Sequence, residues 1–599
     1  MRKALCAGLL LAACTCTGLA LLGTQPGAQD VAKPDTSTTT GRTEADLTAV
    51  INDEISKVWK RDKIRPADRC TDEEFLRRVY LDTVGMPPTV EEAVEFLDSN
   101  DKAKRDKLID RLIDDPRFGR HMADQWAVLL SARNAQSLSG QHLFANWMAE
   151  EINSGTGMQT IFREIVLAEG ELVDNPEIVP WFTDGAGVPF TDMIGKLSKN
   201  LTGVQIQCAQ CHDHPYDENL TQKSFQGMAA FLTATQPLID NKLRPQRIYV
   251  RTNPDGPLKI LKAAEMYDKL KPEQKAQVDQ YIDYVKPVTL DGVAADTRDP
   301  KAWRTKLAAW LTSDDNVQTR RYVANRMWSI AFGSGLVNPV DDFNPLNEPS
   351  HPELLDALAG DLLDNGWDVR RLYRAILKSD AWQLSGNAPK KAERWHFASY
   401  PVRPLTPEQF LSTLLGLLDK PQLDKIISDS LLKPLDKAVE DLKAAEEAQK
   451  KSKDKNMQYY DYDLATMNRY RELFGAIDGR WYISRWAAGR YASLSQDDEM
   501  NSGENFTMSI NQALAVMNGQ FTNALSGSGK DSLLERIGNS FKTYDERVEA
   551  LYLTVLSRRP TRAEAKTLEA YFKEAKVPTA AAEDLLYALL MTTEFATNH

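Results

Sequence analysis

The stretch AVEFLDSNDKAKRDKLIDRLIDDPRFG, residues 93–119, decides the fold class of this 599-residue chain. Within it Leu108 pairs with Leu112 and Ile109 with Ile113 at a spacing of four, and charged residues occupy the other positions. This spacing places the apolar side chains on one face of an α-helix, and the pattern stops at Pro116. Similar patterns recur through most of the chain from Leu47 onward. The sequence therefore predicts a mainly α-helical protein.

The helical patterns form two blocks with a small β element between them. We expect one block over residues 46–235, a small β-containing connector over 236–300, and a second block over 301–599. In the connector, RIYVRTNPDGP and VKPVTLDGV alternate in polarity and carry turn residues, which is typical of short strands. Residues 435–456 contain no aromatic residue and are dense in charge, so we predict a solvated helix or hairpin arm there.

The overall composition excludes several classes of protein. Apolar residues make up 42% and charged residues 26%, as in ordinary soluble globular proteins, which excludes collagen and multi-span membrane proteins. The net charge of -12 argues against a nucleic-acid binder, because such proteins neutralise phosphates with Lys and Arg. Six cysteines are too few for a disulfide scaffold.

The N-terminus is typical of an export signal. Arg2 and Lys3 precede an apolar stretch that runs to about Gly23, so we expect a signal peptide over residues 1–28. Residues 29–45 are rich in Thr, Gly, Asp and Pro and predict a disordered tether. The expected location is therefore extracytoplasmic, either periplasmic or secreted.

Three interpretations of this leader remain open. Cleavage near Ala28 would release a soluble protein. The sequence LAAC, which ends at Cys14, also fits a lipoprotein cleavage box, and a lipid on Cys14 would then be the protein's membrane attachment. An uncleaved transmembrane anchor is the third interpretation, because about 20 residues can span a bilayer.

The sharpest chemical motif is CAQCH, residues 208–212. Two thiols three residues apart, Cys208 and Cys211, can each add to a vinyl group of haem, and His212 then presents its imidazole to the iron. We therefore predict a c-type haem cofactor with His212 as the iron ligand. Such a group would make the chain a redox protein, either an electron carrier or a haem oxidoreductase, with an extracytoplasmic redox partner.

Other interpretations of the motif remain open. The two thiols could form a redox-active disulfide. With His214 and Asp217 they could bind a divalent metal, which would suggest a non-haem hydrolase or binding module. They could also simply brace the fold of a structural envelope protein. If haem is present, the sixth iron ligand is undecided among a set of histidines and methionines that includes His121, His142, His351, His396, Met122 and Met193.

Several stretches of the first block resemble one family. They are FLRRVYLDTVGMPPTVEEAVEFL (75–97), DDPRFGRHMADQW (114–126) and LTGVQIQCAQCHDHPYDENLTQKSFQGMAAFL (201–232). They resemble the planctomycete domain of unknown function numbered 1549, which is described as cytochrome-C-associated. The resemblance implies an exported protein of a kind often found with cytochrome c and sugar-binding domains. It also implies a substrate related to polysaccharide breakdown.

The second block resembles the usual companion of that domain, the domain of unknown function numbered 1553. The resemblance lies in residues 325–385, VRPLTPEQFLSTLL (402–415), SINQALAVMNG (509–519), LYLTVLSRRPTRAE (551–564) and TTEFATNH (592–599). The last motif ends in Asn598 and His599. Its match to the family suggests that this end docks on the protein, although a surface end is the simpler expectation.

A second polar region within the matching positions is NPVDDFNPLNEPSHPELLD, residues 338–356. Asp341, Asp342 and His351 could line a polar site for a sugar or for the haem edge. Ser350, with Glu353 three residues later, predicts a capping box at the start of a helix. In the first block, Arg77, Arg78 and Asp82 predict an internal salt-bridge network.

Overall fold

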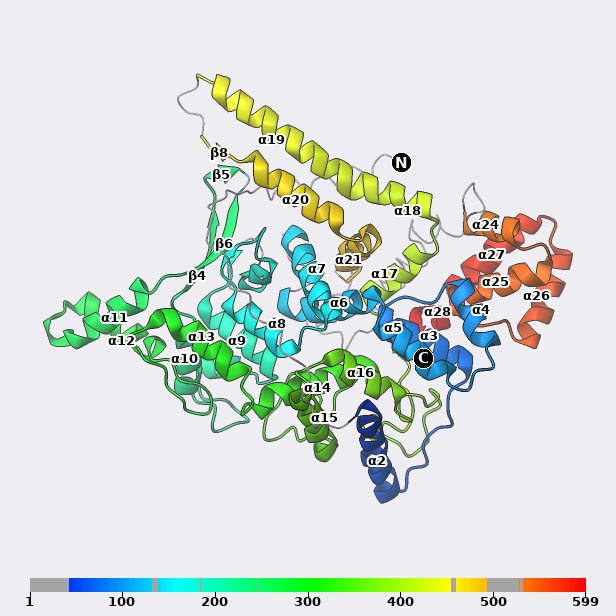
Figure 1. The fold of residues 1–599 in the computed structure, drawn as a ribbon, viewed down its shortest axis with the longest axis horizontal. Coiled ribbons are helices and arrows are strands. Elements are labelled where there is room, and N and C mark those ends of the chain that lie inside the picture. The colour runs from blue at the N-terminus through cyan, green and yellow to red at the C-terminus, as the bar shows by residue number, and fades with distance from the viewer. Residues whose placement is uncertain are drawn as a thin grey trace.

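The structure is a computed structural model that describes residues 43–131, 138–183, 186–244, 246–453, 459–492, 527 and 532–599. The predicted signal peptide, most of the predicted tether, Cys14 and the 509–519 motif lie outside these residues. The expectation of a mainly α-helical protein is confirmed, since helices follow one another along the chain and the strands are few and short (Figure 1). Within the described ranges, no helix is both long and apolar enough to cross a membrane.

The first block is a succession of helices. It comprises α2 (Glu44–Asp62), α3 (Asp72–Val84), α4 (Val90–Asp98), α5 (Lys104–Ile113), α6 (Pro116–Ser131), α7 (Leu138–Ser154), α8 (Met158–Leu167), η1 (Pro176–Trp181), α9 (Phe190–Thr202), η2 (Gln207–Gln210) and α10 (Gln222–Ala230), with the two-residue strands β1 (Gly170–Glu171), β2 (Phe182–Thr183) and β3 (Ala186–Gly187).

The stretch 93–119 is divided among three of these helices. The side chains of Leu108, Ile109, Leu112 and Ile113 are all buried on one face of α5, as their spacing predicts. A turn between α4 and α5 is held by Asp101, whose carboxylate accepts a hydrogen bond from the Ala103 amide at 2.9 Å. Pro116 ends the pattern by opening the next helix, α6, where a missing N–H has no cost.

The connector is part strand and part helix. Its strands are β4 (Thr235–Asp240), β5 (Leu243–Arg244) and β6 (Arg247–Thr252), and β6 lies between β1 and β4 in an antiparallel sheet. The following residues form η3 (Tyr267–Lys269), η4 (Asp283–Val285), α11 (Asp255–Glu265) and α12 (Pro272–Tyr281). The stretch VKPVTLDGV contributes only an isolated bridge between Val288 and Ala294, so the strand expected there is not formed.

The second block is also helical. It comprises η5 (Pro300–Ala302), α13 (Trp303–Leu311), α14 (Val317–Phe332), α15 (Pro352–Asp364), α16 (Val369–Lys378), η6 (Arg394–His396), β7 (Arg403–Pro404), α17 (Pro407–Gly416), α18 (Lys420–Ile427), η7 (Ser428–Leu432), α19 (Lys433–Lys451), β8 (Asp461–Tyr462), α20 (Leu464–Ala476), α21 (Gly479–Ala492), α24 (Leu533–Ser540), α25 (Tyr544–Leu556), α26 (Arg562–Glu574), α27 (Pro578–Leu590), α28 (Thr593–Ala596) and β9 (Thr597–Asn598).

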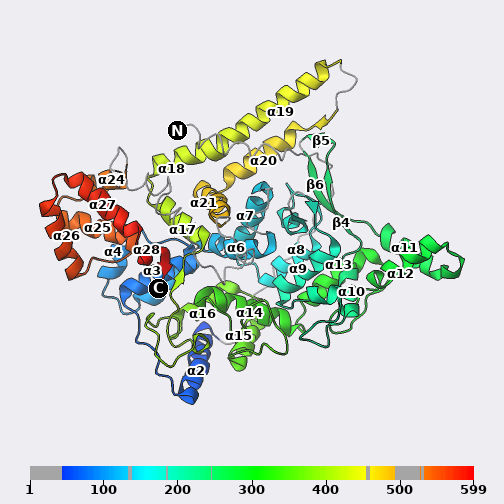
Figure 2. The ribbon, with the colours of Figure 1, turned by 180° about the vertical axis from the view of Figure 1, so that it is seen from behind.

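The charged segment of this block lies in a helical hairpin. α19 runs beside α20 along one side of the molecule in both ribbon views (Figures 1 and 2). Beyond the end of α19, β8 pairs in parallel with β5, with Asp461 opposite Leu243. The far end of the hairpin is thereby attached to β5, the short strand between β4 and β6, which lies more than 200 residues earlier in the chain.

The two blocks share one hydrophobic core. Trp126 of α6 packs against Phe162 of α8 at 5.5 Å and against Tyr322 of α14 at 6.2 Å between ring centroids. One contiguous cluster of buried apolar side chains runs from α2 to α25. Because this cluster draws on both blocks, we expect them to fold as one unit.

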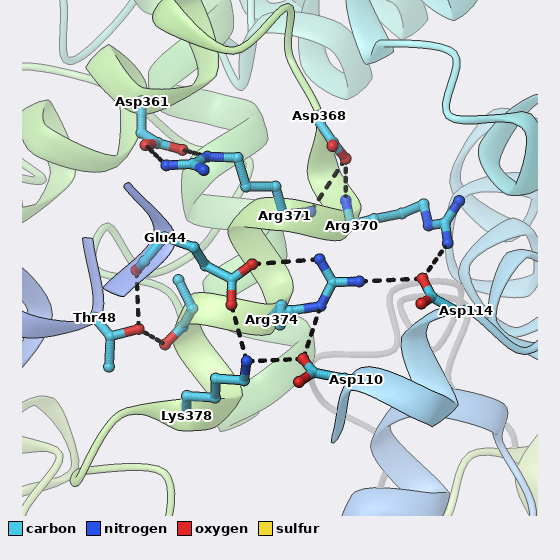
Figure 3. A network of polar contacts seen from close by, with 11 residues as sticks. Glu44, Thr48, Asp110, Asp114, Asp361, Asp368, Arg370, Arg371, Arg374 and Lys378 are labelled. Carbon is cyan, nitrogen blue, oxygen red and sulfur yellow. Dashed lines mark hydrogen bonds and ion pairs between the residues drawn. The ribbon is translucent and has the colours of Figure 1, made fainter. Parts of the chain in front are cut away.

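Ion pairs also connect the blocks where α16 meets α2 and α5 (Figure 3). Arg374 contacts Glu44 of α2 at 3.3 Å and Asp114, the residue that follows α5, at 3.1 Å. Lys378 contacts the same Glu44 at 3.0 Å and Asp110 of α5 at 2.7 Å. Two cations on one helix thus hold carboxylates from two helices of the other block.

The carboxylate of Asp82 is fully buried and is the centre of a polar network. It accepts hydrogen bonds from Arg403 of β7, from the Tyr400 hydroxyl at 2.9 Å and from the Asn598 amide at 2.6 Å. Asn598 lies in β9, which pairs antiparallel with β7, so this end of the chain is docked and the expectation of a surface end is wrong.

The predicted salt bridges among Arg77, Arg78 and Asp82 are not formed, although all three side chains are buried. Arg77 donates to the carbonyl of Phe595 at 2.7 Å, and Arg78 donates to the carbonyls of Trp382 at 2.7 Å and Leu384 at 2.8 Å. The ion pair of Asp82 is made with Arg403 instead. Burial raises the pKa of Asp82, while the nearby charge of Arg403 opposes that shift.

Replacing Asp82 by Ala should destabilise the protein by about 3–5 kcal/mol, because Arg403 would be left buried without its counter-charge. Urea unfolding would measure the change. The matched control is Asp98→Ala, which removes a surface ion pair with Arg559 and should cost about 1 kcal/mol or less. Equal losses in the two variants would contradict the central role of Asp82.

Candidate functional site

The CAQCH motif forms an exposed turn that is held to the core by buried apolar side chains. α9 ends at Gly203, whose φ of 72° reverses the chain direction toward η2. Ile206 and Ala209 are buried at 1% and 0% exposure and fix the turn to the core. Cys208 and Cys211 are exposed free thiols, and the side chain of His212 is also exposed.

The ring of His212 is oriented by the main chain. Its Nδ1 lies 2.7 Å from the carbonyl oxygen of Asp213. A carbonyl can only accept a hydrogen bond, so the network assigns the ring proton to Nδ1. Nε2 of the neutral ring therefore carries a lone pair. A histidine that binds a metal commonly has this arrangement, with one nitrogen on the metal and the other N–H on a carbonyl.

His214 has the opposite arrangement. Its Nδ1 accepts a hydrogen bond from the main-chain N–H of Tyr216 at 3.3 Å, which places the proton of the neutral ring on Nε2. Asp217 is used locally, since its Oδ1 accepts from the N–H of Asn219 at 3.0 Å. Both residues stabilise the loop between η2 and α10.

The structure does not assemble the divalent-metal site that the sequence suggested, which would use Cys208, Cys211, His214 and Asp217. Among the residues that the structure describes, no group of three or more His, Cys, Asp and Glu side chains is placed to hold a metal ion. The cause is local, because the ring of His214 and the carboxylate of Asp217 are turned to main-chain amides of their own loop.

Aromatic side chains lie beside the turn. Tyr284 of η4 contacts Phe190 at the start of α9, with ring centroids 5.6 Å apart. The pKa of Tyr284 is raised, mainly by burial, and the nearby Cys211 contributes to the shift. Tyr216 is 60% exposed in the same loop. Sequence reasoning missed Tyr284 because it lies 73 positions after Cys211 and follows no local motif.

The first part of the 338–356 region lies next to the segment that leads into the turn. The Asp341 carboxylate is 3.1 Å from the ammonium of Lys199 on α9, and it accepts from the Gln205 side chain at 3.5 Å. The Phe343 amide donates to the Gly203 carbonyl at 2.8 Å. The structure therefore brings together two regions that the sequence singled out separately. Asp342 uses its carbonyl to accept from the Asn347 side chain at 2.8 Å.

His351 lies in a different environment. It is buried between the rings of Trp395 and Phe397, and its Nδ1 is 3.0 Å from the Ser350 hydroxyl. The predicted capping box at Ser350 is wrong, because the residue before α15 is His351 and no side chain caps that helix. Both the amide and the hydroxyl of Ser350 donate to the Leu336 carbonyl instead.

The other histidines proposed as iron ligands are held in the interior. His121 packs against Gly85, where a Cβ would lie 2.6 Å from the ring Nδ1. His142 lies against Tyr482 with the rings tilted and their centroids 4.2 Å apart, and His396 stacks against Trp395 at 3.7 Å. The sulfur-bearing side chains of Met122 and Met193 are both fully buried in the core.

These observations define a mainly α-helical protein whose two blocks share a core and expose a CAQCH turn. Residues 50–237 match the family model described as a protein of unknown function (DUF1549), short name PSCyt2, and residues 303–572 match the one described as a protein of unknown function (DUF1553). No curated protein and no solved structure matches the chain. The chain belongs to the family of proteins in which a DUF1549 domain is followed by a DUF1553 domain, as its motifs predicted.

The two cysteines of the turn should react with a thiol reagent in the native, reduced protein, because both are exposed. Cys70 is 4% exposed and should react only after unfolding. A chromogenic thiol assay on a chain without residues 1–28 would show two fast thiols and one slow thiol. A Cys70→Ala variant should keep both fast thiols, and a fast reaction at Cys70 would contradict the structure.

Acid should destabilise the fold through its buried histidines. Burial lowers the pKa of His121 and of His351 to about 4, against 6.5 for an unfolded chain. Between these values only the unfolded state binds the proton, so stability should fall as the pH drops from 6.5 to 4, by about 3 kcal/mol for each histidine.

Urea unfolding of a His351→Gln variant at pH 7 and pH 4.5 tests this dependence. The loss of stability between the two pH values should be smaller than in the parent protein. The parent protein, measured at the same two pH values, is the reference. An unchanged dependence in His351→Gln would show that His351 does not contribute.

Proposed function

We propose that this chain is an exported redox protein that holds one c-type haem through Cys208, Cys211 and His212. The orientation of His212 is the observation that carries the proposal. Its Nδ1 faces the Asp213 carbonyl at 2.7 Å, so that Nε2 is available to iron, and it directly follows two exposed free thiols. The function would be electron transfer or haem-dependent oxidation and reduction.

The residues present fit this cofactor in three respects. Both thiols are reachable and unbonded, as thioether formation requires. The His212 ring has the protonation that a metal ligand needs. Phe190, Tyr284 and Tyr216 supply apolar surface near the turn. When bound, haem would supply one-electron chemistry at iron, and the protein residues would anchor it, ligate it and limit its exposure to water.

Export, a redox partner and a carbohydrate-related substrate are parts of the same proposal. Attachment of c-type haem takes place outside the cytoplasm, which agrees with the predicted export signal. The short name PSCyt2 of the matching family model also suggests an association with cytochromes. An extracytoplasmic redox partner would exchange electrons with the haem. The carbohydrate-related substrate follows from the family resemblance.

The alternatives receive less support from the geometry. A non-haem metal hydrolase or binding module would need His214 as a ligand, but its Nδ1 accepts from a main-chain amide. A purely structural role for the cysteines would be expected to bury them. In this turn the buried anchors are Ile206 and Ala209, whereas both cysteines are exposed.

Expression in a host that matures c-type haem tests the proposal. The purified protein should show a Soret band at about 410 nm that survives acid–acetone extraction, and its mass should rise by about 616 Da. Cys208→Ala should lose one thioether bond, and His212→Ala should alter the spectrum through loss of the iron ligand.

His214→Ala is the matched control, because it changes a neighbouring histidine and should keep both the haem and the spectrum. A colourless protein at the mass of the polypeptide alone would refute the haem assignment. A stoichiometric divalent metal that is lost in His214→Ala would support the metal-binding alternative.

A further inference from the structure

Gln222, the first residue of α10, contacts the CAQCH turn at two points. Its main-chain N–H donates to the carboxylate of Asp213 at 2.9 Å. Its side-chain amide donates to the carbonyl of Gln210 at 3.1 Å. Gln210 and Asp213 are the residues on either side of Cys211 and His212. Gln222 therefore holds the main chain both before and after these two residues.

Asp213 has two roles in the same contact. Its carboxylate accepts from the first N–H of α10, a position where the helix dipole favours negative charge. Its carbonyl is the group that faces His212 Nδ1. Because the Asp213 side chain is bound to α10, the Asp213 peptide group that orients the His212 imidazole is held in place as well.

α10 is itself well anchored. Thr221 caps it, because its hydroxyl accepts from the Ser224 amide, and Phe225, Met228 and Ala229 are buried in the core. The contacts of Gln222 thus tie an exposed turn to a rigid helix. The bonds are polar and lie at the surface, so their loss should leave the core intact.

We propose that Gln222 and Asp213 are positioning residues that hold the His212 ring in its iron-binding orientation and strengthen it as a ligand. This inference rests on the proposed function. A carbonyl held firmly against Nδ1–H makes the imidazole a more electron-rich ligand, which favours the oxidised iron. Releasing the carbonyl should therefore raise the midpoint potential of the haem.

The first test uses the protein without haem. Amide hydrogen–deuterium exchange of peptides covering residues 207–214 should be about fivefold faster in Gln222→Ala, which corresponds to the loss of one ordinary hydrogen bond. The matched control is Gln205→Ala, which removes the same type of side chain from the preceding segment, where it contacts Asp341. Exchange in the control should match the parent protein.

The second test uses the haem-loaded protein and measures the midpoint potential by spectroelectrochemistry. The potential should rise in Asp213→Ala, which frees the Asp213 peptide from α10, and by a smaller amount in Gln222→Ala, which loses the side-chain bond to Gln210 but keeps the main-chain bond to Asp213. It should stay near the parent value in Gln205→Ala and in Asp213→Asn, because the Asn side chain keeps an oxygen that can accept from the α10 amide.

The outcomes separate this inference from the proposed function. A parent protein that shows no Soret band refutes the proposed function before any variant is compared. Faster exchange together with a raised potential supports the positioning role. Faster exchange with an unchanged potential overturns it, because Gln222 would then brace the loop without affecting the ligand. Unchanged exchange also overturns it.

Discussion

The ion pair between the fully buried carboxylate of Asp82 and Arg403 is the interaction on which the arrangement of the two blocks depends. Asp82 comes from the first block, while Arg403, Tyr400 and Asn598 come from the second. A buried carboxylate is costly unless hydrogen bonds satisfy its oxygens. Asp82 is satisfied only when α3, β7 and β9 meet, so its burial requires the docked end of the chain and the shared core together.

The candidate site also depends on contacts between the two blocks. These contacts hold the turn that carries the CAQCH motif and do not involve its thiols or its imidazole. The turn is held by Ile206 and Ala209 in the shared core, and Asp341 of the second block pairs with Lys199 at the base of that turn. The thiols and the imidazole themselves remain at the surface. This support beneath an exposed motif would suit the haem that we propose, because the turn would not have to refold to hold it.

Much of the helical architecture could be predicted because it follows from local periodicity. The buried face of α5 is set by residues four apart. Predictions that relied on a local pattern alone failed where the hydrogen bonds of the segment depended on residues far away in the chain. VKPVTLDGV alternates in polarity but has no partner strand beyond one bridge, and Ser350 has the residues of a capping box but bonds to Leu336 instead. Tyr284 and Gln222 could not be assigned to the site because no motif links them to it.

The sequence by itself determined the helical class, the pairing of the two domains and the CAQCH motif, since each depends on residues close together in the chain. Tertiary structure decided how the loop that carries the two histidines is held. His212 and His214 are two positions apart and chemically identical. They differ because one ring meets a carbonyl and the other meets an amide N–H. These ring contacts are local to the loop, but the Asp213 peptide group that meets His212 is itself held by the bond between the Asp213 carboxylate and the first N–H of α10, which no local pattern encodes.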